Sequence, residues 1–509
     1  MPSLALFGIL HLPLFSLGSL SEEMKDRFYN QTHLIVFLFV IFCFAKLSII
    51  KHIPLINDEA YTLTISRHFS LSYFDHPPLM MWISYFIHQF EIIEFHIFRI
   101  PFIIFGIFTS FFLFKIGSII YSKEIGIVSA ILYFISPFFF LSGGLFIIPD
   151  ASLNFSVAGG TYIAIRLIFH NENNTFLWLT LGLFLLIAFL SKYQAYLFGM
   201  ALFMAFFIWK KNVLFTKYFN ISLLISVIGL VPVLVWNFDN NFESFAFHGN
   251  RSSFTFDISH IFSSLFAQLF FLLPTTGFLI FLSLNKKLTS KYEKFLILLA
   301  LPTIILFNIL ILLSDNSFAH WSMMGWMLLI PIASNHLISM KSFKLQLIIL
   351  KVLSVLMTVV LISSLITHAK TGFITRGYGE KIPGWDNTRE LLDWRLIANI
   401  LGKNLQEKEL DSMATLNWYD SGQLTAAFDY RHSVGVIGPK SNHFKYIKLN
   451  DQKFTTLIDV RLIHINNHFE LKQRTLNYNY KITNRIELPL FRGIQKYGII
   501  NILSVEKIN

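Results

Sequence analysis

Long apolar runs recur along this chain from residue 33 to residue 367. A helix needs about 20 consecutive apolar residues to cross the hydrocarbon core of a bilayer. The charged fraction agrees with membrane insertion, because only 14% of the 509 residues are charged, against about a quarter in soluble domains. The sequence therefore predicts a mostly α-helical, multi-pass membrane protein. About eleven transmembrane helices are expected, near residues 33–51, 97–119, 125–148, 151–169, 176–191, 193–209, 218–236, 260–283, 295–313, 320–338 and 344–367.

Lysine and arginine residues gather in alternate connections between these runs. They are Lys25, Arg27, Lys115, Lys123, Lys210, Lys211, Lys217, Lys286, Lys287, Lys291, Lys294, Lys341 and Lys344. The positive-inside rule places such connections in the cytoplasm, so the N-terminus is predicted to be cytoplasmic. The outward segments are then 52–96, 149–151, 237–259, 314–320 and the chain after residue 368. Most acidic, histidine and aromatic residues of the connections lie there, so we expect the chemistry on that face.

Two compositional features exclude other kinds of protein. The net charge of +11 would suit a nucleic-acid partner, but the basic residues form no stripe with interleaved aromatic residues, so none is expected. Cys43 is the only cysteine, so neither an intrachain disulfide nor a cysteine metal site can form. Residues 1–20 are apolar but contain Pro2 and Pro13 and lack a basic start. An interfacial segment is favoured there over a cleaved signal peptide. An additional transmembrane helix in this segment is a further alternative, and it would change the predicted orientation.

The composition changes near residue 369, where Gly, Pro, Asp and Asn become more frequent. We predict three parts: a cytoplasmic or interfacial segment over 1–32, a transmembrane catalytic domain over 33–368 and a soluble α/β domain over 369–509. The last part has about 140 residues, an ordinary domain size. Its expected elements are a helix over 388–401 capped by Asp386, strands at 414–418, 433–438, 455–460 and 497–505, and a helix over 419–430.

The most polar outward segment, NDEAYTLTISRHFSLSYFDHPPLMMW over 57–82, follows the first apolar run. Asn57 is expected to cap a short surface helix, with Asp58 and Glu59 in its first turn, where the helix dipole favours anions. Both acids have a structural role as capping residues. Several acids close together on one outer segment favour a functional site as well, because ionisable groups beside a membrane usually mark one.

The second half of the same segment predicts another surface helix. Asp75 and His76 stand directly before Pro77 and Pro78, and proline suits a helix start. An apolar stripe at helical spacing then follows, made of Leu79, Ile83, Phe86, Ile87 and Phe90.

Three other outward segments carry polar residues. Asp150 follows Pro149 at the end of the third run, where capping and function are equally good explanations. Lys192 opposes the positive-inside bias, which favours either a phosphate partner or a snorkelling side chain. The loop 236–251 offers Asp239, Glu243, His248 and Arg251, and His320 begins a later run. A lone histidine is more often a hydrogen-bonded structural residue than a metal ligand.

Acids, imidazoles and cations thus come from several outer segments. Carboxylates can activate or orient an acceptor, and cations can hold a phosphate leaving group as its charge develops. This combination favours transfer from a lipid phosphate. A nucleotide cofactor is not expected, since soluble nucleotide sugars are not found outside the cytoplasmic membrane.

The ordered motifs D-E-A-Y, S-R-H, L-S-Y-F-D-H-P-P-L, S-P…P-D-A, L-S-K-Y, P-V-L-V-W-N, S-F-A-F and H-W resemble those of bacterial GT-C type membrane glycosyltransferases. That group includes the protein O-mannosyltransferases and the lipid A aminoarabinose transferase (glycosyltransferase families 39 and 83). The resemblance covers nearly the whole chain, including WYDSGQLTAAFDY in the last domain. It implies a GT-C fold, a polyprenyl-phosphate-linked sugar donor and inverting transfer at the periplasmic face of the inner membrane.

The resemblance also implies roles for particular residues. Asp58 matches the essential acid of the first outer loop, and Glu59 and Asp150 are further catalytic candidates. His76, Lys192 and Arg251 are expected to bind the donor phosphate. Asp75 and His248 are expected to hold a candidate divalent metal ion. The pair Asp75–His76 replaces a Glu–Lys pair of the aminoarabinose transferase, which leaves open the metal and the charge of His76.

The expected function is therefore sugar transfer from a polyprenyl-phosphate donor to lipid A or another envelope glycan, with membrane lipids as further partners. Protein O-glycosylation is the alternative with the same chemistry. A lipid-linked-sugar transporter or flippase is the alternative from another class, disfavoured because no comparable polar set lies at mid-membrane depth. A structural subunit with an outer interaction domain is a third interpretation, which the acidic outer loops disfavour. The sequence leaves the sugar, the acceptor and the oligomeric state open.

Overall fold

The computed structural model describes residues 40, 43–44, 46–172, 174–249, 258–285, 290–313, 318–340, 344–375, 387–438, 442–447, 453–462, 475 and 478–508. The chain divides into two compact units, Met1–Ile49 and Ile50–Asn509. In the first unit the described residues from 40 to 49 are helical, within the first predicted span. The predictions for residues 1–32 lie outside the described part.

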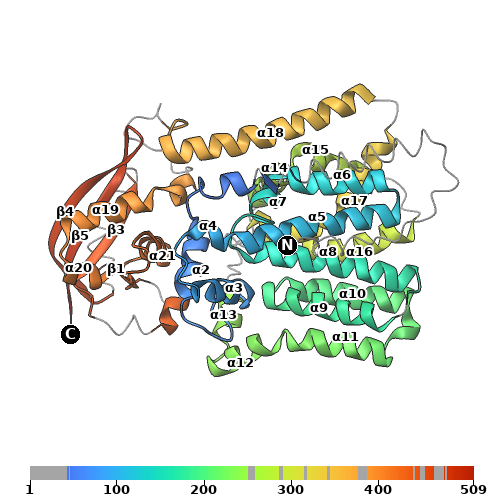
Figure 1. The fold of residues 1–509 in the computed structure, drawn as a ribbon, viewed down its shortest axis with the longest axis horizontal. Helices are drawn as coiled ribbons and strands as arrows, with labels where there is room; N and C mark the ends of the chain where they lie inside the picture. The colour runs from blue at the N-terminus through green and yellow to red at the C-terminus, as the bar shows by residue number, and fades with distance from the viewer. Residues whose placement is uncertain are drawn as a thin grey trace, which may run out of the picture. The chain divides into compact units, whose positions relative to one another are not determined.

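The second unit contains a large set of apolar helices (Figure 1). They are α4 (Phe95–Phe98), α5 (Ile100–Ile120), α6 (Lys123–Ile135), α7 (Pro137–Leu141), α8 (Pro149–Phe169), α9 (Thr175–Ser191), α10 (Ala195–Trp209), α11 (Lys217–Ile228), α12 (Val231–Asp239), α14 (Ile258–Leu272), α15 (Pro274–Leu284), α16 (Lys291–Leu313), α17 (Met323–Ser339) and α18 (Lys344–Thr371).

Among the described residues, four helical stretches are long and apolar enough to cross a membrane: Phe95–Ile120, Pro149–Phe169, Lys217–Asp239 and Lys291–Leu313. A fifth is the pair α14 and α15, which is bent by 107°. Eleven spans are therefore not confirmed. The run predicted at 260–283 is interrupted because Pro274 disfavours a helical residue before it, and Leu273 adopts a φ of 68°.

Two short helices follow the first predicted span, as the sequence predicts: α2 (Asn57–Ile65) and α3 (Leu79–His88). One detail of α2 was wrong, because its N-cap is Ile56 and Asn57 is already helical. The stripe predicted for α3 is not its buried face. Met80, Met81 and Ser84 are buried instead, while Phe86 and Phe90 of the stripe are 62% and 76% exposed.

The C-terminal domain contains a five-stranded mixed sheet in the order β2-β1-β3-β5-β4. The strands are β1 (Met413–Thr415), β2 (Gly435–Val436), β3 (Thr456–Leu462), β4 (Tyr480–Arg492) and β5 (Gln495–Lys507). β1 pairs with β2 and β3 in parallel, whereas β5 pairs with β3 and β4 antiparallel. Strand β4 was not predicted.

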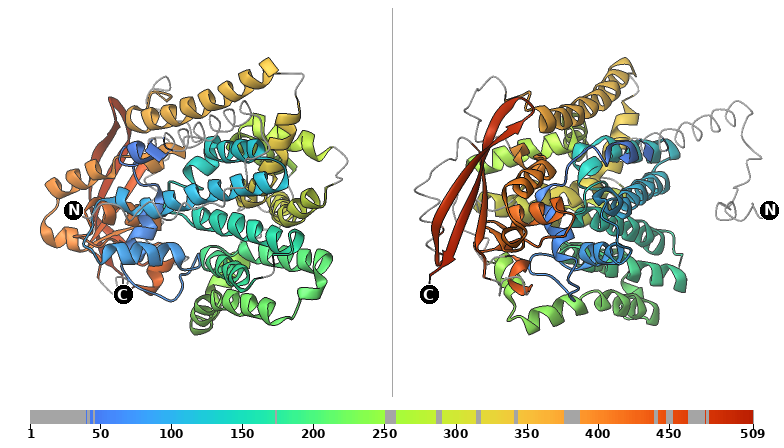
Figure 2. Two further views of the ribbon diagram at one scale, coloured as in Figure 1. Left: turned by 45° about the vertical axis from the view of Figure 1, so that its right-hand side comes forward. Right: turned by 60° about the vertical axis from the view of Figure 1, so that its left-hand side comes forward.

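Helices α19 (Trp394–Asn404), α20 (Glu407–Asp411) and α21 (Trp418–Ala427) belong to the same domain (Figure 2). The side chains of α19 and α21 share one apolar core with alternate strand residues, among them Ile458 and Ile502. The predicted cap Asp386 lies outside the described residues. Helix α19 begins later than predicted, and Asp393 caps it by accepting a hydrogen bond from the backbone N–H of Leu396.

Helix α21 packs directly on α2. The two backbones meet at Gly422, where a Cβ atom would lie 2.9 Å from the backbone nitrogen of Tyr61. Thr64 donates a hydrogen bond to the carbonyl oxygen of Gly422 (3.3 Å), and Gln423 donates one to Leu55 (2.9 Å). The C-terminal domain therefore covers the surface helix that carries Asp58 and Glu59.

Candidate active site

Glu59 and Asp58 are adjacent in α2 but have opposite environments. Glu59 is fully buried, and each of its carboxylate oxygens accepts two hydrogen bonds. Oε1 accepts from Arg99 Nε (2.8 Å) and from the N–H of Ile147 (3.0 Å), and Oε2 accepts from Arg99 Nη2 (2.5 Å) and from the N–H of Ile56 (3.2 Å). Asp58 is exposed. The bonds to Glu59 occupy its acceptor positions, whereas Asp58 is accessible to solvent.

Arg99 is the cationic partner of the buried Glu59 carboxylate. This arginine is itself fully buried between α4 and α5, and it also donates hydrogen bonds to the backbone carbonyls of Ile50, Ile53 and Pro54. A buried ion pair is tolerated only when its geometry is good and its remaining donors are satisfied. The Glu59–Arg99 pair therefore fixes the start of α2 against the start of α5.

A second ion pair joins the ends of two apolar helices. Lys192 follows α9, and its Nζ lies 2.9 Å from both carboxylate oxygens of Asp150, in the first turn of α8. Both side chains are about a tenth exposed. The structure thus brings together one predicted catalytic residue and one predicted phosphate-binding residue. A lysine at this position was expected to have either a phosphate partner or a snorkelling side chain. In the structure its partner is instead the Asp150 carboxylate of the same protein.

Asp75 is the centre of a third cluster, between α2 and α3. Its Oδ1 accepts a hydrogen bond from the hydroxyl of Tyr61 (3.2 Å), and its Oδ2 lies 4.0 Å from His76 Nε2. The Nε2 atom of His248, from α13 (Glu243–Gly249), lies 3.0 Å from the Asp75 backbone carbonyl oxygen. The predicted residues Asp75, His76 and His248 are therefore neighbours in space.

The C-terminal domain reaches this cluster through a 3-10 helix, η7 (His443–Tyr446). The backbone N–H of His443 donates to the Tyr61 hydroxyl (2.8 Å), and the His443 Nδ1 accepts from the N–H of Phe74 (3.2 Å). Burial lowers the pKa of His443 to about 3. Burial, followed by the charge of Asp75, raises the pKa of Tyr61 well above its usual value. Both groups are therefore neutral hydrogen-bonding residues at physiological pH.

The same 3-10 helix is tied to α13. Lys445 Nζ lies 2.5 Å from Glu243 Oε1, and the hydroxyl of Tyr446 donates a hydrogen bond to the same carboxylate. The hydrogen bond from Lys445, followed by the one from Tyr446, lowers the pKa of Glu243. On the other side of α13, the ring of Tyr193 contacts His248 edge-on at 4.9 Å. Segments from four parts of the chain thus meet at Asp75.

Comparisons with known proteins can be set against this geometry. Residues 75–236 match the model of the dolichyl-phosphate-mannose-protein mannosyltransferase family. Among solved structures, ArnT from Cupriavidus metallidurans bound to undecaprenyl phosphate aligns with a TM-score of 0.60 at 12% identity, over 93% of this chain and 98% of that one. The chain is similar to GT-C type membrane glycosyltransferases. This result confirms the resemblance inferred from the motifs.

Two further structures share the GT-C fold. ArnT from the same organism in the apo state aligns with a TM-score of 0.59 at 12% identity, over 93% of this chain and 98% of that one. The archaeal oligosaccharyltransferase AglB from Archaeoglobus fulgidus, in complex with an inhibitory peptide and a dolichol-phosphate, aligns with a TM-score of 0.50 at 10% identity, over 84% of this chain and 69% of that one. No curated protein matches the sequence. At these identities the structural comparisons establish the fold.

The predicted metal ligands can be tested against their contacts. A carbonyl oxygen only accepts hydrogen bonds, so the His248 Nε2 that faces the Asp75 carbonyl carries the hydrogen and is not available to a metal. Asp75 and His248 also belong to no described group of three Asp, Glu, His or Cys side chains with metal-ligand spacing. The assignment of Asp75 and His248 as metal ligands, and the metal ion itself, stay predictions of the sequence.

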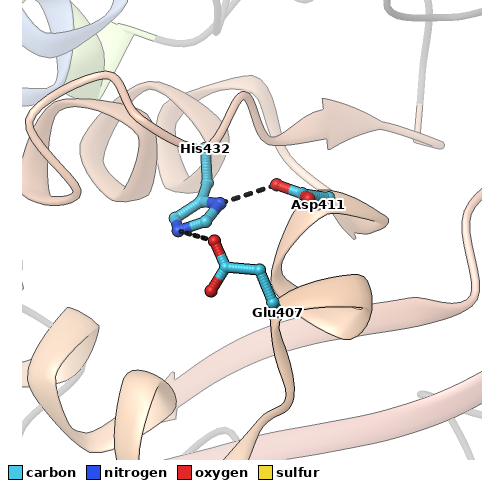
Figure 3. A group of neighbouring side chains, drawn as sticks. All are labelled: Glu407, Asp411 and His432. Atoms are coloured by element: carbon cyan, nitrogen blue, oxygen red, sulfur yellow. Dashed lines mark hydrogen bonds and ion pairs between the residues drawn. The ribbon is translucent and has the colours of Figure 1, made fainter.

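One group with that spacing does occur in the described part of the C-terminal domain. Glu407 and Asp411 of α20 face His432, and their ligand atoms all lie within 4.8 Å of one another (Figure 3). Asp411 lies 2.8 Å from His432 Nδ1, a hydrogen-bond distance, and Glu407 lies 3.9 Å from Nε2. The side chain of Glu407 is 78% exposed and that of Asp411 is 64% exposed. The group is best explained as a polar contact joining α20 to the chain after α21.

Three other polar residues were named in the outward segments: Asp239, Arg251 and His320. Arg251 lies outside the described residues. Asp239 is exposed at the end of α12, and His320 stacks on Phe138 and Phe318.

Three residues of the site were not anticipated from the sequence: Tyr61, Arg99 and His443. A signal existed for Arg99, because an arginine inside an apolar run requires a partner. His443 lies 382 residues from Tyr61 in the sequence, and nothing in its own segment indicates that contact.

Proposed function

We propose that this chain is an inverting glycosyltransferase. It would transfer a sugar from a polyprenyl-phosphate carrier to lipid A or another envelope glycan, at the periplasmic face of the bacterial inner membrane. The observation that carries the proposal is the fold shared over 93% of the chain with ArnT, whose structure holds undecaprenyl phosphate. The matched family segment, 75–236, adds support because it contains Asp75, His76, Asp150 and Lys192.

The reaction breaks the bond between the sugar C1 and the carrier phosphate oxygen, and the carrier leaves with the electron pair. An acceptor oxygen attacks C1 from the opposite face and inverts it. A hydroxyl acceptor must release a proton, and the exposed Asp58 is the proposed base. If the acceptor is a phosphate oxygen, no proton moves and Asp58 orients it. Lys192 is proposed to stabilise the charge developing on the leaving phosphate, with His76 and Arg251 as further phosphate-binding residues.

Glu59 and Asp150 are proposed to act as positioning residues. Hydrogen bonds occupy the acceptor positions of Glu59, so it holds α2 in place instead of moving a proton. Asp150 holds the ammonium group of Lys192 at 2.9 Å. Positioning of this kind matters because a displacement of about 1 Å can cost two orders of magnitude in rate.

The test compares cells that lack the gene with cells complemented by the wild type, by Asp58→Asn or by the matched control Asp239→Asn, another exposed outward aspartate. Mass spectrometry of lipid A and envelope glycans should show one sugar mass missing in the deletion. Wild type and Asp239→Asn should restore it, whereas Asp58→Asn should not. Full restoration by Asp58→Asn, at equal protein level, would overturn its catalytic role. Unchanged envelope glycans in the deletion would overturn the acceptor class.

Protein O-glycosylation is the second candidate, and the description of the matched family as protein mannosyltransferases favours it. Intact-mass measurement of periplasmic proteins from the same strains distinguishes the two. Loss of a sugar mass from proteins, with lipid A unchanged, would select the protein acceptor. A transporter or flippase would leave sugar on the lipid carrier and modify neither acceptor.

A further inference from the structure

A cavity of about 490 Å³ opens where the C-terminal domain meets the ends of membrane segments. Lys51 and His52, at the end of the first predicted span, form one wall, and Lys370 from the last turn of α18 forms another. The first turn of α19, the turn between β4 and β5, and residues of α21 also line the cavity. None of the predicted active-site residues that the structure describes lines this cavity.

The lining carries more cations than carboxylates. Lys51, Lys370, Arg395 and Arg492 line the cavity together, with Asp393 as the one carboxylate among the described lining residues. Arg395 also lies 3.4 Å from Asp429, which is outside the lining. The Asp393 carboxylate already caps α19 through the N–H of Leu396 (3.1 Å). A hollow lined by charges of one sign concentrates ions of the opposite sign, because its low-dielectric walls focus the field. The cavity is therefore suited to an anion.

Arg492 is held rigidly in this lining. Only 3% of the residue is exposed, its guanidinium stacks on Tyr497 at 4.2 Å, and Nη1 and Nη2 donate to the side-chain and backbone oxygens of Thr388. Both Thr388 oxygens are neutral, so these bonds orient the guanidinium without cancelling its charge. A planar guanidinium in a fixed position is well suited to bind a phosphate.

The remaining lining makes the cavity amphipathic. Ile93, Leu396 and Phe491 are 48%, 42% and 48% exposed, and all three contribute to the cavity wall. A free inorganic anion would leave these apolar side chains in water. A ligand that carries a phosphate beside apolar groups would cover both parts of the lining. Lys51 and Lys370, which flank membrane segments, lie where the headgroups of a bilayer leaflet are found.

We propose that this cavity binds the phosphate headgroup of an anionic phospholipid from the leaflet that faces the C-terminal domain. The phosphate lies among Lys51, Lys370 and Arg395, with Arg492 behind it, and the glycerol and upper acyl carbons lie on Ile93 and Phe491. The bound lipid joins α18 to the start of α19. The site is separate from the proposed sugar-transfer site and does not depend on that function.

The experiment uses the full chain in nanodiscs of phosphatidylcholine that contain increasing fractions of phosphatidylglycerol. Native mass spectrometry counts the phosphatidylglycerol molecules retained on the released protein. Each Lys near an anionic surface contributes about fivefold in affinity. We therefore expect Lys51→Gln/Lys370→Gln to raise the half-saturating lipid fraction at least tenfold. The matched control Lys403→Gln/Lys408→Gln, exposed lysines of α19 and α20 outside the cavity, should bind as the wild type does.

Several outcomes would overturn the proposal. One is equal retention of phosphatidylglycerol by the wild type and by Lys51→Gln/Lys370→Gln. Another is equal retention of phosphatidylcholine by the wild type. A third is complete displacement of the lipid by inorganic phosphate at the same concentration, which would make the site one for free anions. Arg395→Gln provides a second variant, and a severalfold loss of retention there, with an unchanged elution profile, would support the proposal independently of the lysines.

Discussion

Charged side chains gather in two regions of this protein, and the regions differ in how the charges are balanced. In the paired-charge region, Glu59 faces Arg99 and Asp150 faces Lys192, each at hydrogen-bond distance and largely hidden from water. In the cavity at the start of α19, Lys51, Lys370, Arg395 and Arg492 outnumber the carboxylates, which are Asp393 in the described lining and Asp429 beside Arg395. Balanced charges in a dry environment fix the geometry of the groups around them, and an excess of positive charge favours an anionic ligand. The following variants test that distinction.

The largest effect is expected from Glu59→Gln. Removing one partner of a buried ion pair leaves the other charge uncompensated and costs about 3–5 kcal/mol. Unfolding of the purified protein in neutral detergent, followed against temperature, measures the loss. Asp58→Asn is the matched control, since the neighbouring residue is exposed and its substitution should change stability by less than about 0.5 kcal/mol. Equal stability of the two variants would contradict the structural role of Glu59.

The second effect concerns Asp150 and Lys192. Asp150→Asn or Lys192→Gln alone should cost about 2–3 kcal/mol, because each leaves a mostly buried charge without its partner. The double variant should cost less than the sum of the two, by about 1–2 kcal/mol. The same unfolding measurement on the four proteins gives the coupling. Strictly additive losses would show that the pair does not interact energetically.

The third effect is a pH dependence that comes from His443. Its pKa is about 3 in the folded protein and about 6.5 in an unfolded chain. Between these values the unfolded chain binds more protons, so stability is lost as the pH falls from about 6.5 towards 3. The loss between pH 7 and pH 5 should be about 2 kcal/mol.

His443→Gln keeps an acceptor for the N–H of Phe74 and removes the titration. The variant should therefore show a smaller difference in unfolding temperature between pH 7 and pH 5 than the wild type. His88, whose pKa burial lowers to about 4, contributes in the same direction and remains in the variant. An unchanged pH dependence would exclude His443 as its source.

The smallest effect is expected at the cavity. Lys51 and Lys370 are exposed, so Lys51→Gln/Lys370→Gln should change stability in neutral detergent by less than about 0.5 kcal/mol. Added phosphatidylglycerol should then stabilise the wild type more than the variant, because a ligand that binds only the folded state stabilises it. A large loss of stability in the absence of lipid would show that these lysines have a structural role, as Glu59 and Arg99 do.

Local patterns predicted local structure well. Pro77 and Pro78 marked the start of α3, and the composition change near residue 369 preceded the end of α18 at Thr371 by only a short distance. Strand β4 was missed because its sequence, YKITNRIELPLFR, contains charged residues and Pro489. It is an edge strand, where proline and exposed charges are tolerated. The helix expected from residue 388 begins at Trp394, since Asp393 provides the cap.

The candidate site was predicted only in part, for a physical reason. Sequence identified most of its charged residues, but not which of them are paired. Arg99 decides whether Glu59 takes part in the reaction or holds α2 in place. Asp150 decides whether the ammonium group of Lys192 has a partner within the protein. These contacts arise from tertiary packing, which no local pattern encodes. The fold, by contrast, follows from apolar runs and motif order, which are properties of the sequence itself.

The hydrogen bond between His443 and Tyr61 also has a consequence for biogenesis. The membrane helices can insert as the ribosome makes them, but the cluster at Asp75 is completed only after residue 446 has been synthesised and folded outside the membrane. A chain that terminates before η7 would have its apolar helices and an unfinished site. The cluster at Asp75 is therefore assembled only once η7 has been made and has docked against α2 and α13.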